Sequence, residues 1–243
     1  ALAAANGAEL EVVYVRDGEQ RRTVLTPVWD ADAGQWRAGM WVRDSSAGVG
    51  TLTFVAESGI FAGLGHPISD SDTGTSVALR SGEIVPCQIT GCSKGTAGSP
   101  GELKGRFLSA HAIGTIRING ENGVYGSTRA QFAGQKMEVA FAQEVEAGDA
   151  EIWTTTSGET PRAYRVKIEK ISDADPRRNM VLRVVDRELL AQTGGIVQGM
   201  SGSPVVQNGR LVGAVTHVLV NDPTRGYGIF AQTMLEQAER VTE

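Results

Sequence analysis

The sequence predicts a mainly β protein made of short strands joined by tight turns. Its 243 residues include 31 glycines and eight prolines, without the glycine repeat at every third position that marks collagen. Short runs of apolar residues recur between turn signals such as Asp17-Gly18 and Asn208-Gly209, which is the pattern of β-hairpins. With 41% hydrophobic residues, a chain of this length can bury a substantial core.

The charge of the chain argues against a nucleic-acid partner. The formal net charge is -5 and the Lys and Arg residues are not clustered, so the basic surface that binds a phosphate backbone is not expected. No window approaches the ~18 apolar residues of a membrane-spanning helix, and the N-terminus lacks the pattern of a secretory signal. We therefore expect a soluble piece.

The beginning of the chain predicts a small segment of its own. Residues 1–5 have the composition of a helix end, and Asn6-Gly7 supplies the usual C-terminal cap. Residues 10–16 and 21–28 predict a hairpin. This order resembles the last third of a PDZ domain without its carboxylate-binding loop; a plain edge hairpin is the alternative.

A polar connection at residues 30–39 marks the expected domain boundary. It divides the chain into a partial PDZ-like segment at 1–38 and a main domain at 39–243.

The sequence of the main domain predicts a series of strands followed by a C-terminal helix. A short helix at 186–194 has Asp186 at its N-cap and Gly194 after its end. Residues 94–105 are expected to form a glycine-rich loop and residues 120–126 a turn-rich link. The closing helix is expected at 233–240, and the strands are expected at 51–56, 60–65, 77–79, 83–85, 88–90, 107–118, 136–142, 151–156, 164–171 and 181–185, followed by a hairpin across Asn208-Gly209.

No metal or other cofactor is expected. Cys87 and Cys92 have no second pair and no suitably spaced histidine to complete a zinc site. They could be bridged only across a turn at Gly91, and two free thiols are the alternative. Asp70 and Asp72 lie in a fragment of a calcium loop that lacks its other ligands, which favours a solvated turn.

A candidate nucleophile lies at Ser201, between Gly199 and Gly202. The nucleophile elbow of α/β-hydrolases requires glycine two residues after the serine, where this chain has Ser203. The alternative is the geometry of chymotrypsin-like proteases, in which the amides of Gly199 and Ser201 form the oxyanion hole. The alternative without catalysis is that these glycines only form a turn between two strands.

His66 is the candidate general base, because it follows a predicted strand, a glycine turn and a second strand, as in the first barrel of chymotrypsin-like proteases. The order of His before Ser is also that of chymotrypsin. Gly213 follows Ser201 by twelve residues, and Thr216 then falls where a hydroxyl supports the catalytic acid. These features together predict a chymotrypsin-like double β-barrel with short helices and a C-terminal helix, acting as a serine endopeptidase on protein substrates.

Five stretches carry a resemblance to a known family. They are WVRDS at 41–45, GHPISDSDT at 65–73, GSPGE at 98–102, GGIVQGMSGSP at 194–204 and GAVTHVLVNDP at 213–223. They resemble the SpoIVB peptidase family of spore-forming bacteria, over essentially residues 40–232. The resemblance implies a peptidase on the secreted side of a membrane, in the intermembrane space of a developing spore, with a membrane tether outside this sequence. It also implies cleavage of a regulatory membrane protein, and of the peptidase itself, in signalling that activates a sigma factor.

The residue that orients His66 stays open at this point. The resemblance places the acid at Asp186, although a helix N-cap is the commonest use of Asp in that setting. Asn119 follows His66 by 53 residues, nearer the position of the acid in the chymotrypsin plan, and an Asn orients the imidazole of papain-like proteases. Asp70 and Asp72 are further alternatives.

Two residues are candidates for substrate binding. His217 adjoins Thr216 on a predicted substrate-binding strand, whereas His111 has no neighbouring chemistry and is expected to be structural. Gly195 lies six residues before Ser201, at the position that floors the primary pocket, so nothing predicts a preference for Lys or Arg.

Overall fold

The computed structural model describes residues 2–16, 18–40, 46–70, 72–109, 111–132, 134–172 and 174–242. Its internal contacts divide the chain into two units, Ala1–Ala47 and Gly48–Glu243. Asp17 of the first predicted turn, the WVRDS motif at 41–45 and Ser71 lie outside the described residues. The assignment of residues 1–38 to a PDZ-like segment stays a prediction.

The first unit is a helical turn followed by two hairpins. Helix α1 (Leu2–Ala5) precedes β1 (Leu10–Arg16) and β2 (Glu19–Leu25), which pair antiparallel, as do β3 (Val28–Asp30) and β4 (Gln35–Arg37). Trp36 donates from Nε1 to Asn6 at 3.2 Å and lies edge-on to Trp29. The predicted helix end and first hairpin are confirmed, with β2 nearer the turn than expected.

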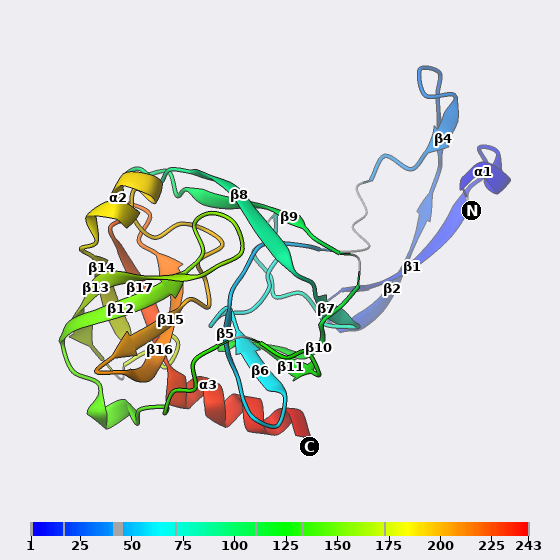
Figure 1. The fold of residues 1–243 in the computed structure, drawn as a ribbon. Coiled ribbons are helices and arrows are strands. Elements are labelled where there is room, and N and C mark those ends of the chain that lie inside the picture. Colours follow the sequence, from blue (N-terminus) through cyan, green and yellow to red (C-terminus); the bar gives the residue numbers. More distant parts are fainter. Residues whose placement is uncertain are drawn as a thin grey trace. The chain divides into compact units, whose positions relative to one another are not determined.

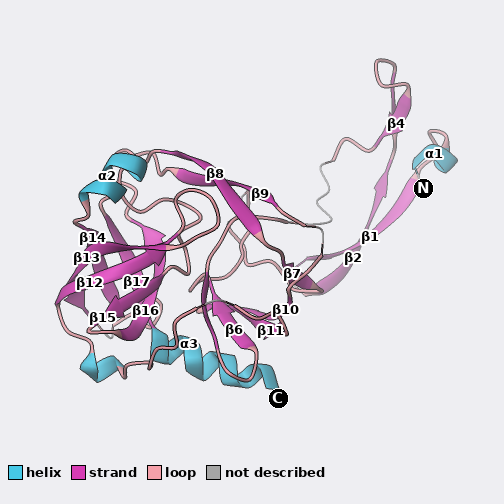
Figure 2. Cartoon of the chain, viewed as in Figure 1, coloured by secondary structure: helices cyan, strands magenta, loops and turns pink. Residues whose placement is uncertain are grey.

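The second unit begins with an open sheet (Figures 1 and 2). Among the described residues it has the order β5-β6-β11-β10-β7. A separate two-stranded ribbon follows β7 in the chain and consists of β8 and β9. The bounds are Leu52–Val55 for β5, Ile60–Gly63 for β6, Gly82–Ile84 for β7, Cys87–Ser93 for β8, Glu102–Phe107 for β9, Gly114–Gly120 for β10 and Gly123–Thr128 for β11.

The second half of this unit is a closed barrel in the order β12-β13-β14-β17-β16-β15. Its interior is a cluster of fully buried aliphatic side chains that includes Ile152, Ile168 and Leu182. The bounds are Gly148–Thr154 for β12, Arg162–Ile171 for β13, Met180–Val184 for β14, Pro204–Gln207 for β15, Arg210–Val218 for β16 and Arg225–Phe230 for β17.

Helices occupy the ends of the barrel. The short helix α2 (Arg187–Thr193) precedes the serine loop, and a 3-10 turn (Ala142–Glu144) precedes β12. Helix α3 (Ala231–Ala238) buries Met234 and Ala238 in one cluster with Ala62 and Tyr125 of the sheet and with Ala214 and Ile229 of the barrel, and a 3-10 turn (Glu239–Thr242) ends the described chain. The helix therefore packs across both halves of the unit. The predicted mainly β, chymotrypsin-like fold with a C-terminal helix is confirmed with one closed barrel, whereas the described strands of the other predicted barrel form an open sheet.

Several local predictions were wrong. Residues 77–79 form no strand, and the expected strand 107–118 is divided between the end of β9 and β10. Residues 120–126 were expected to be a turn-rich link, but residues from Gly123 onward form β11, because its glycines allow close packing of the sheet. A Cβ on Gly126 would lie 2.7 Å from Phe61. Residues 136–142 form no strand; they pair with the barrel through one isolated bridge, Val139 to Leu211, and Ala140 packs in the barrel core. The last four residues of the expected loop 94–105 belong to strand β9, since they pair with β8.

Cys87 and Cys92 are free, half-buried thiols, and burial raises the pKa of both. Within the described ranges, no three His, Cys, Asp or Glu side chains gather into a group that could hold a metal ion. Searched over the same residues, no helix combines the length and apolar character that crossing a bilayer requires.

Candidate active site

Ser201 lies in a short loop that is bound by its carbonyl groups to the open sheet. The amide of Thr51 donates to the carbonyl of Ser201 at 3.0 Å, and the Thr51 hydroxyl donates to the carbonyl of Gly199 at 3.3 Å. The buried Thr53 hydroxyl donates to the carbonyl of Gly202 at 2.8 Å. Strand β5 and the residue before it therefore fix the loop that carries the serine.

The amide groups of the same loop divide into used and unused donors. Those of Met200, Gly202 and Ser203 donate to backbone carbonyls at 2.8 to 3.1 Å. Those of Gly199 and Ser201 donate to no group in the described part of the chain. Gly199 has φ +94°, which a side chain would strain. The two unused amides are the pair predicted to form the oxyanion hole, which needs free donors.

His66 follows a left-handed turn at the end of β6. Leu64 and Gly65 have φ +65° and +70°, and this conformation is rare for a residue such as Leu. The amide of Leu64 donates at 3.2 Å to the carbonyl of Thr51. A Cβ on Gly65 would lie 2.8 Å from the side chain of Thr216. The turn therefore brings His66 to strand β16, and Thr51 connects it to the serine loop.

The hydrogen bond of His66 defines which of its ring nitrogens can accept a proton. Nδ1 lies 2.8 Å from the carbonyl oxygen of Pro67. Because a carbonyl only accepts, Nδ1 carries the proton and Nε2 has the free lone pair. This is the tautomer that a general base requires.

The hydroxyl of Ser201 donates to the backbone carbonyl of Thr216 at 2.9 Å. A hydroxyl has one proton to donate, so in this structure the serine is held by strand β16 and not by His66. The Thr216 hydroxyl is buried and has no partner among the described residues. Thr216 thus contacts Ser201 through its backbone, whereas the predicted support of an acid by its hydroxyl is not formed here.

Asp186 caps helix α2 in this structure and does not contact His66. Its carboxylate accepts from the amides of Glu188 at 2.9 Å and Leu189 at 3.2 Å, and from the amide of Arg165 at 3.3 Å. Burial raises its pKa, but these hydrogen bonds outweigh burial and hold the pKa below its usual value. The N-cap role that competed with catalysis in the sequence is the one observed, and the acid role stays a prediction.

Asn119 binds the segment that follows His66. Its side-chain oxygen accepts from the amide of Ile68 at 2.7 Å, and its nitrogen donates to the carbonyls of Ile68 at 3.0 Å and Val77 at 2.9 Å. These partners are backbone atoms, and the same nitrogen also donates to the Ser76 hydroxyl at 3.4 Å. Asn119 therefore positions the chain two residues beyond His66 and does not orient the imidazole directly.

His217 lies beside His66, with ring centroids 4.9 Å apart. Burial, followed by the charge of His66, lowers the pKa of His217 to about 4, so this ring is neutral near pH 7. Its Nδ1 is buried without a partner among the described residues. His217 lies on strand β16 as expected, and its role in substrate binding stays a prediction.

The remaining sequence candidates lie in local turns or in packed backbone. The Asp70 carboxylate accepts from the amides of Asp72 at 3.0 Å and Thr73 at 2.9 Å. His111 contacts Ser109 at 3.1 Å. Gly195 is buried against Pro223.

Sequence reasoning missed Thr51 and Thr53, which bind the serine loop. Their partners follow them by 148 and 149 residues, and an isolated Thr on a strand gives no signal of such a contact.

A serine whose own amide and that of Gly199 are unused, a histidine beside the strand that binds the serine hydroxyl, and a mainly β fold with a closed barrel are the features of a chymotrypsin-like serine peptidase. A comparison with family models matches residues 34–235 to the description SpoIVB peptidase S55. The chain therefore belongs to the SpoIVB peptidase S55 family.

Solved structures with low identity also match. A Ser-to-Ala mutant of Rv3671c from M. tuberculosis H37Rv, in an inactive form, is 14% identical, with a TM-score of 0.38 over 64% of this chain and 85% of that chain. Human heparin binding protein is 13% identical, with a TM-score of 0.37 over 68% of this chain and 96% of that one. A comparison with curated proteins gave no match.

Proposed function

We propose that this chain is a serine endopeptidase in which Ser201 is the nucleophile and His66 the general base. The observation that carries the proposal is the pair of unused amides at Gly199 and Ser201, in a loop whose other amides are bonded. In the proposed reaction, Nε2 of His66 removes the Ser201 proton as Oγ attacks a peptide carbonyl. The two amides stabilise the oxyanion, His66 protonates the leaving amine, and water then hydrolyses the acyl-enzyme.

The substrate chain would bind along strand β16 as an added antiparallel strand. The pairing of β15 with β16 ends at Pro204 and Ala214, and no described residue pairs with the β15 side of β16 from Thr216 onward. Such an edge binds an extended peptide through main-chain hydrogen bonds. The Thr216 carbonyl holds the Ser201 hydroxyl at rest. A substrate amide that donates to this carbonyl would release the hydroxyl toward His66.

We further propose the biological setting that the family resemblance implies. The substrate is a membrane-associated regulatory protein, and the peptidase also cleaves itself. It acts on the extracytoplasmic side, in the intermembrane space of a developing spore, and its cleavage event activates a sigma factor. The family membership supports this setting, in which the first unit is the remnant of a PDZ domain.

The catalytic proposal is tested by covalent labelling with a fluorophosphonate, followed by peptide mapping. We expect one adduct at Ser201, lost in Ser201→Ala and in His66→Ala. Ser203→Ala is the matched control, because the Ser203 hydroxyl is buried and has no partner among the described residues. No adduct on folded wild-type protein would contradict the assignment.

The setting is tested with membranes from sporulating cells. Wild-type protein should cleave a membrane-associated protein that Ser201→Ala binds and leaves intact, and N-terminal sequencing of the products locates the bond. Cleavage confined to soluble proteins would contradict this part of the proposal. Binding to a partner strand by wild type without cleavage would identify a protease-like binding module instead.

The resting contact of Ser201 with Thr216 favours a second form of the proposal, a latent peptidase. In that form the missing portion of the PDZ domain or the membrane partner completes the site. Its test is to compare cleavage rates of a peptide substrate by this chain alone and with the partner added. An increase in kcat on addition supports latency, and an equal kcat excludes it.

A further inference from the structure

We infer that the primary pocket of this peptidase accepts only a small side chain, such as that of Gly, Ala or Ser, immediately before the cleaved bond. This inference rests on the proposed function and defines its substrate class. It depends on two residues, Ile196 and Val218, that fill the space where a larger substrate side chain would bind.

The position of the pocket follows from the site. In chymotrypsin-like peptidases the residue six positions before the nucleophile lies at the floor of the primary pocket, and here it is Gly195. This glycine is buried and has φ +140°. A Cβ at this position would collide with the carbonyl oxygen of Pro223, so the main chain itself closes the floor.

Ile196 occupies the space above this floor. Its side chain is only 2% exposed, and its amide donates to the carbonyl of Pro223 at 2.8 Å. A Cβ on Gly226 would lie 2.6 Å from Cδ1 of Ile196. The space left by the missing side chain of Gly226 on β17 is therefore filled by Ile196 and is not open to a substrate side chain.

Val218 closes the same space from the neighbouring strand. It pairs with Gly226 across β16 and β17, and its half-buried side chain packs against the core cluster that contains Ile196. Gly226 is thus next to two branched side chains of the protein, Ile196 and Val218, which leave room for only a shallow pocket.

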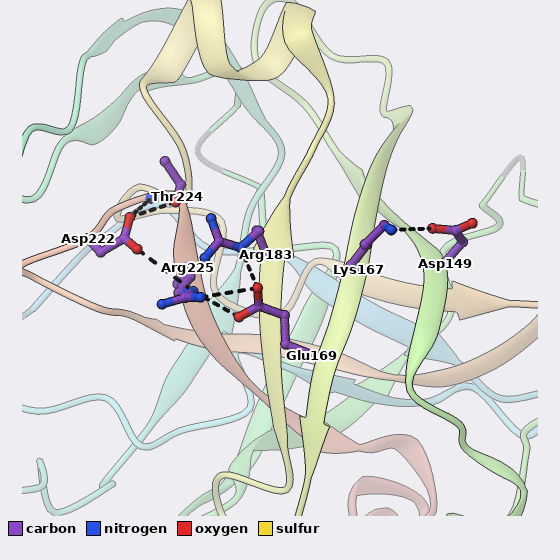
Figure 3. A network of polar contacts seen from close by, with 7 residues as sticks. All are labelled: Asp149, Lys167, Glu169, Arg183, Asp222, Thr224 and Arg225. Carbon is purple, nitrogen blue, oxygen red and sulfur yellow. Dashed lines mark hydrogen bonds and ion pairs between the residues drawn. The ribbon is translucent and has the colours of Figure 1, made fainter.

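Polar contacts hold the turn behind the pocket (Figure 3). Asp222 accepts from the Thr224 hydroxyl at 2.6 Å and forms an ion pair with Arg225 at 3.8 Å. Arg225 also donates to Glu169 at 3.2 Å, and Glu169 binds Arg183. This network fixes the turn that carries Pro223.

The loop before strand β9 packs against the same region. The amide of Gly95 donates to the carbonyl of Thr193 at 2.9 Å, and the amide of Gly98 donates to that of Val220 at 2.8 Å. The pocket is therefore enclosed by bonded main chain on two sides, and Ile196 cannot move aside without disturbing packed backbone.

The test uses peptidyl diphenyl phosphonates that differ only in the side chain next to phosphorus, Ala or Phe, with labelling of Ser201 followed by intact mass. One added methylene changes discrimination by about 10- to 200-fold, so wild type should react with the Ala probe at least about 100-fold faster than with the Phe probe. Ile196→Ala and Val218→Gly should each lower this ratio by about 10-fold or more.

Ile168→Ala is the matched control, because Ile168 is 1% exposed in the same core cluster but lies on β13. Ile168→Ala should lower stability without changing the ratio of the Ala and Phe labelling rates. Partial unfolding lowers both rates equally, so it does not affect this ratio. Ile196→Val is a milder variant should Ile196→Ala fail to fold, and it should shift the ratio in the same direction.

Equal rates for the two probes on wild type, with normal fluorophosphonate labelling, would overturn this inference and leave the proposed function intact. An unchanged ratio in the Ile196 and Val218 variants would do the same. Failure of Ser201 to react with any probe would overturn the proposed function, and this inference with it.

Discussion

The two halves of the peptidase unit differ in how completely their strands are bonded. The barrel β12–β17 is closed and surrounds a large cluster of buried side chains. The described strands of the first half form an open sheet, and a small cluster of three buried side chains, Phe61, Ile116 and Val124, packs on it. Ser201 precedes a barrel strand, whereas His66 follows a strand of the open sheet.

The difference implies that alignment of the two candidate catalytic residues depends on contacts between the halves. A closed barrel has no free edge and keeps its shape, so the serine loop has a rigid support. The open sheet is positioned by helix α3 and by the hydrogen bonds of Thr51 and Thr53. Four predictions test this dependence.

The largest effect is expected from removing either candidate catalytic side chain. Ser201→Ala and His66→Ala should each lower kcat for a cleaved peptide by about 10⁶-fold, and the double variant should lose little more, since the two residues act as a unit. The measurement is steady-state cleavage with thermal unfolding as the folding control. Additive losses in the double variant would show that the residues act independently.

The next effect is expected from breaking the contact between Thr53 and the serine loop. Thr53→Val keeps the shape but leaves the carbonyl of Gly202 without its buried donor, which costs about 1 to 3 kcal/mol. We expect a kcat loss of about 10- to 100-fold at this cost, with substrate KM nearly unchanged.

Thr154→Val is the control for Thr53→Val. The Thr154 hydroxyl is buried without a partner among the described residues, so its removal should not destabilise the barrel or alter kcat. Equal kcat in the two variants would mean that the bond to Gly202 does not position the loop.

A smaller effect is expected at the N-cap of helix α2. Asp186→Ala should lower the free energy of unfolding by about 0.5 to 2 kcal/mol, and Asp186→Asn should restore it, because Asn caps about as well as Asp. Chemical denaturation measures both. A kcat loss near 10⁴-fold in Asp186→Asn with unchanged stability would assign the acid role to Asp186, which its contacts here do not explain.

The smallest effect is expected from the acid dependence of His217. Its pKa is about 4 in the folded chain, against an ordinary value of 6.5 for a solvated imidazole, so between these pH values the unfolded chain binds more protons. Protonation of His217 in the unfolded chain therefore lowers the free energy of unfolding as the pH falls. The loss is absent above pH 6.5 and complete near pH 4. The facing groups are His66, Arg178 and Arg177, which lower the pKa, and Asp175, which raises it.

Between pH 6.5 and pH 4, the Tm of His217→Gln should therefore fall by less than the Tm of the wild-type protein. His111→Gln is the control, because His111 lies on an exposed turn. Parallel curves of Tm against pH for wild type and His217→Gln would show that His217 has the same pKa in the folded and the unfolded chain.

The sequence predicted features that depend on neighbours along the chain. The hairpin across Asn208-Gly209 formed as expected, since Asn208 has φ +52° and Gly209 φ +76°, the left-handed pair that such a turn needs. The cap at Asp186 is equally local. Strand β11 was not predicted, because its glycines have the composition of a turn and become a strand only by pairing with β6 and β10.

The candidate site was predicted in its residue types and only partly in its contacts. The positions of Ser201 and His66 follow from short motifs, whereas the partner of the His66 ring is a backbone oxygen, which every residue carries. No side-chain pattern can indicate such a partner. No sequence pattern predicts the contacts of Thr51 and Thr53 either, because they form between segments far apart in the chain.

The position of Thr51 has a mechanical consequence. Its amide, carbonyl and hydroxyl bind Ser201, Leu64 and Gly199 respectively, so one residue is bonded to the backbone around both candidate catalytic side chains. The chain passes from the first unit through Gly48, Val49 and Gly50 directly into Thr51. A pull applied to the preceding segment would thus be transmitted to the candidate nucleophile and to the candidate general base through one shared residue.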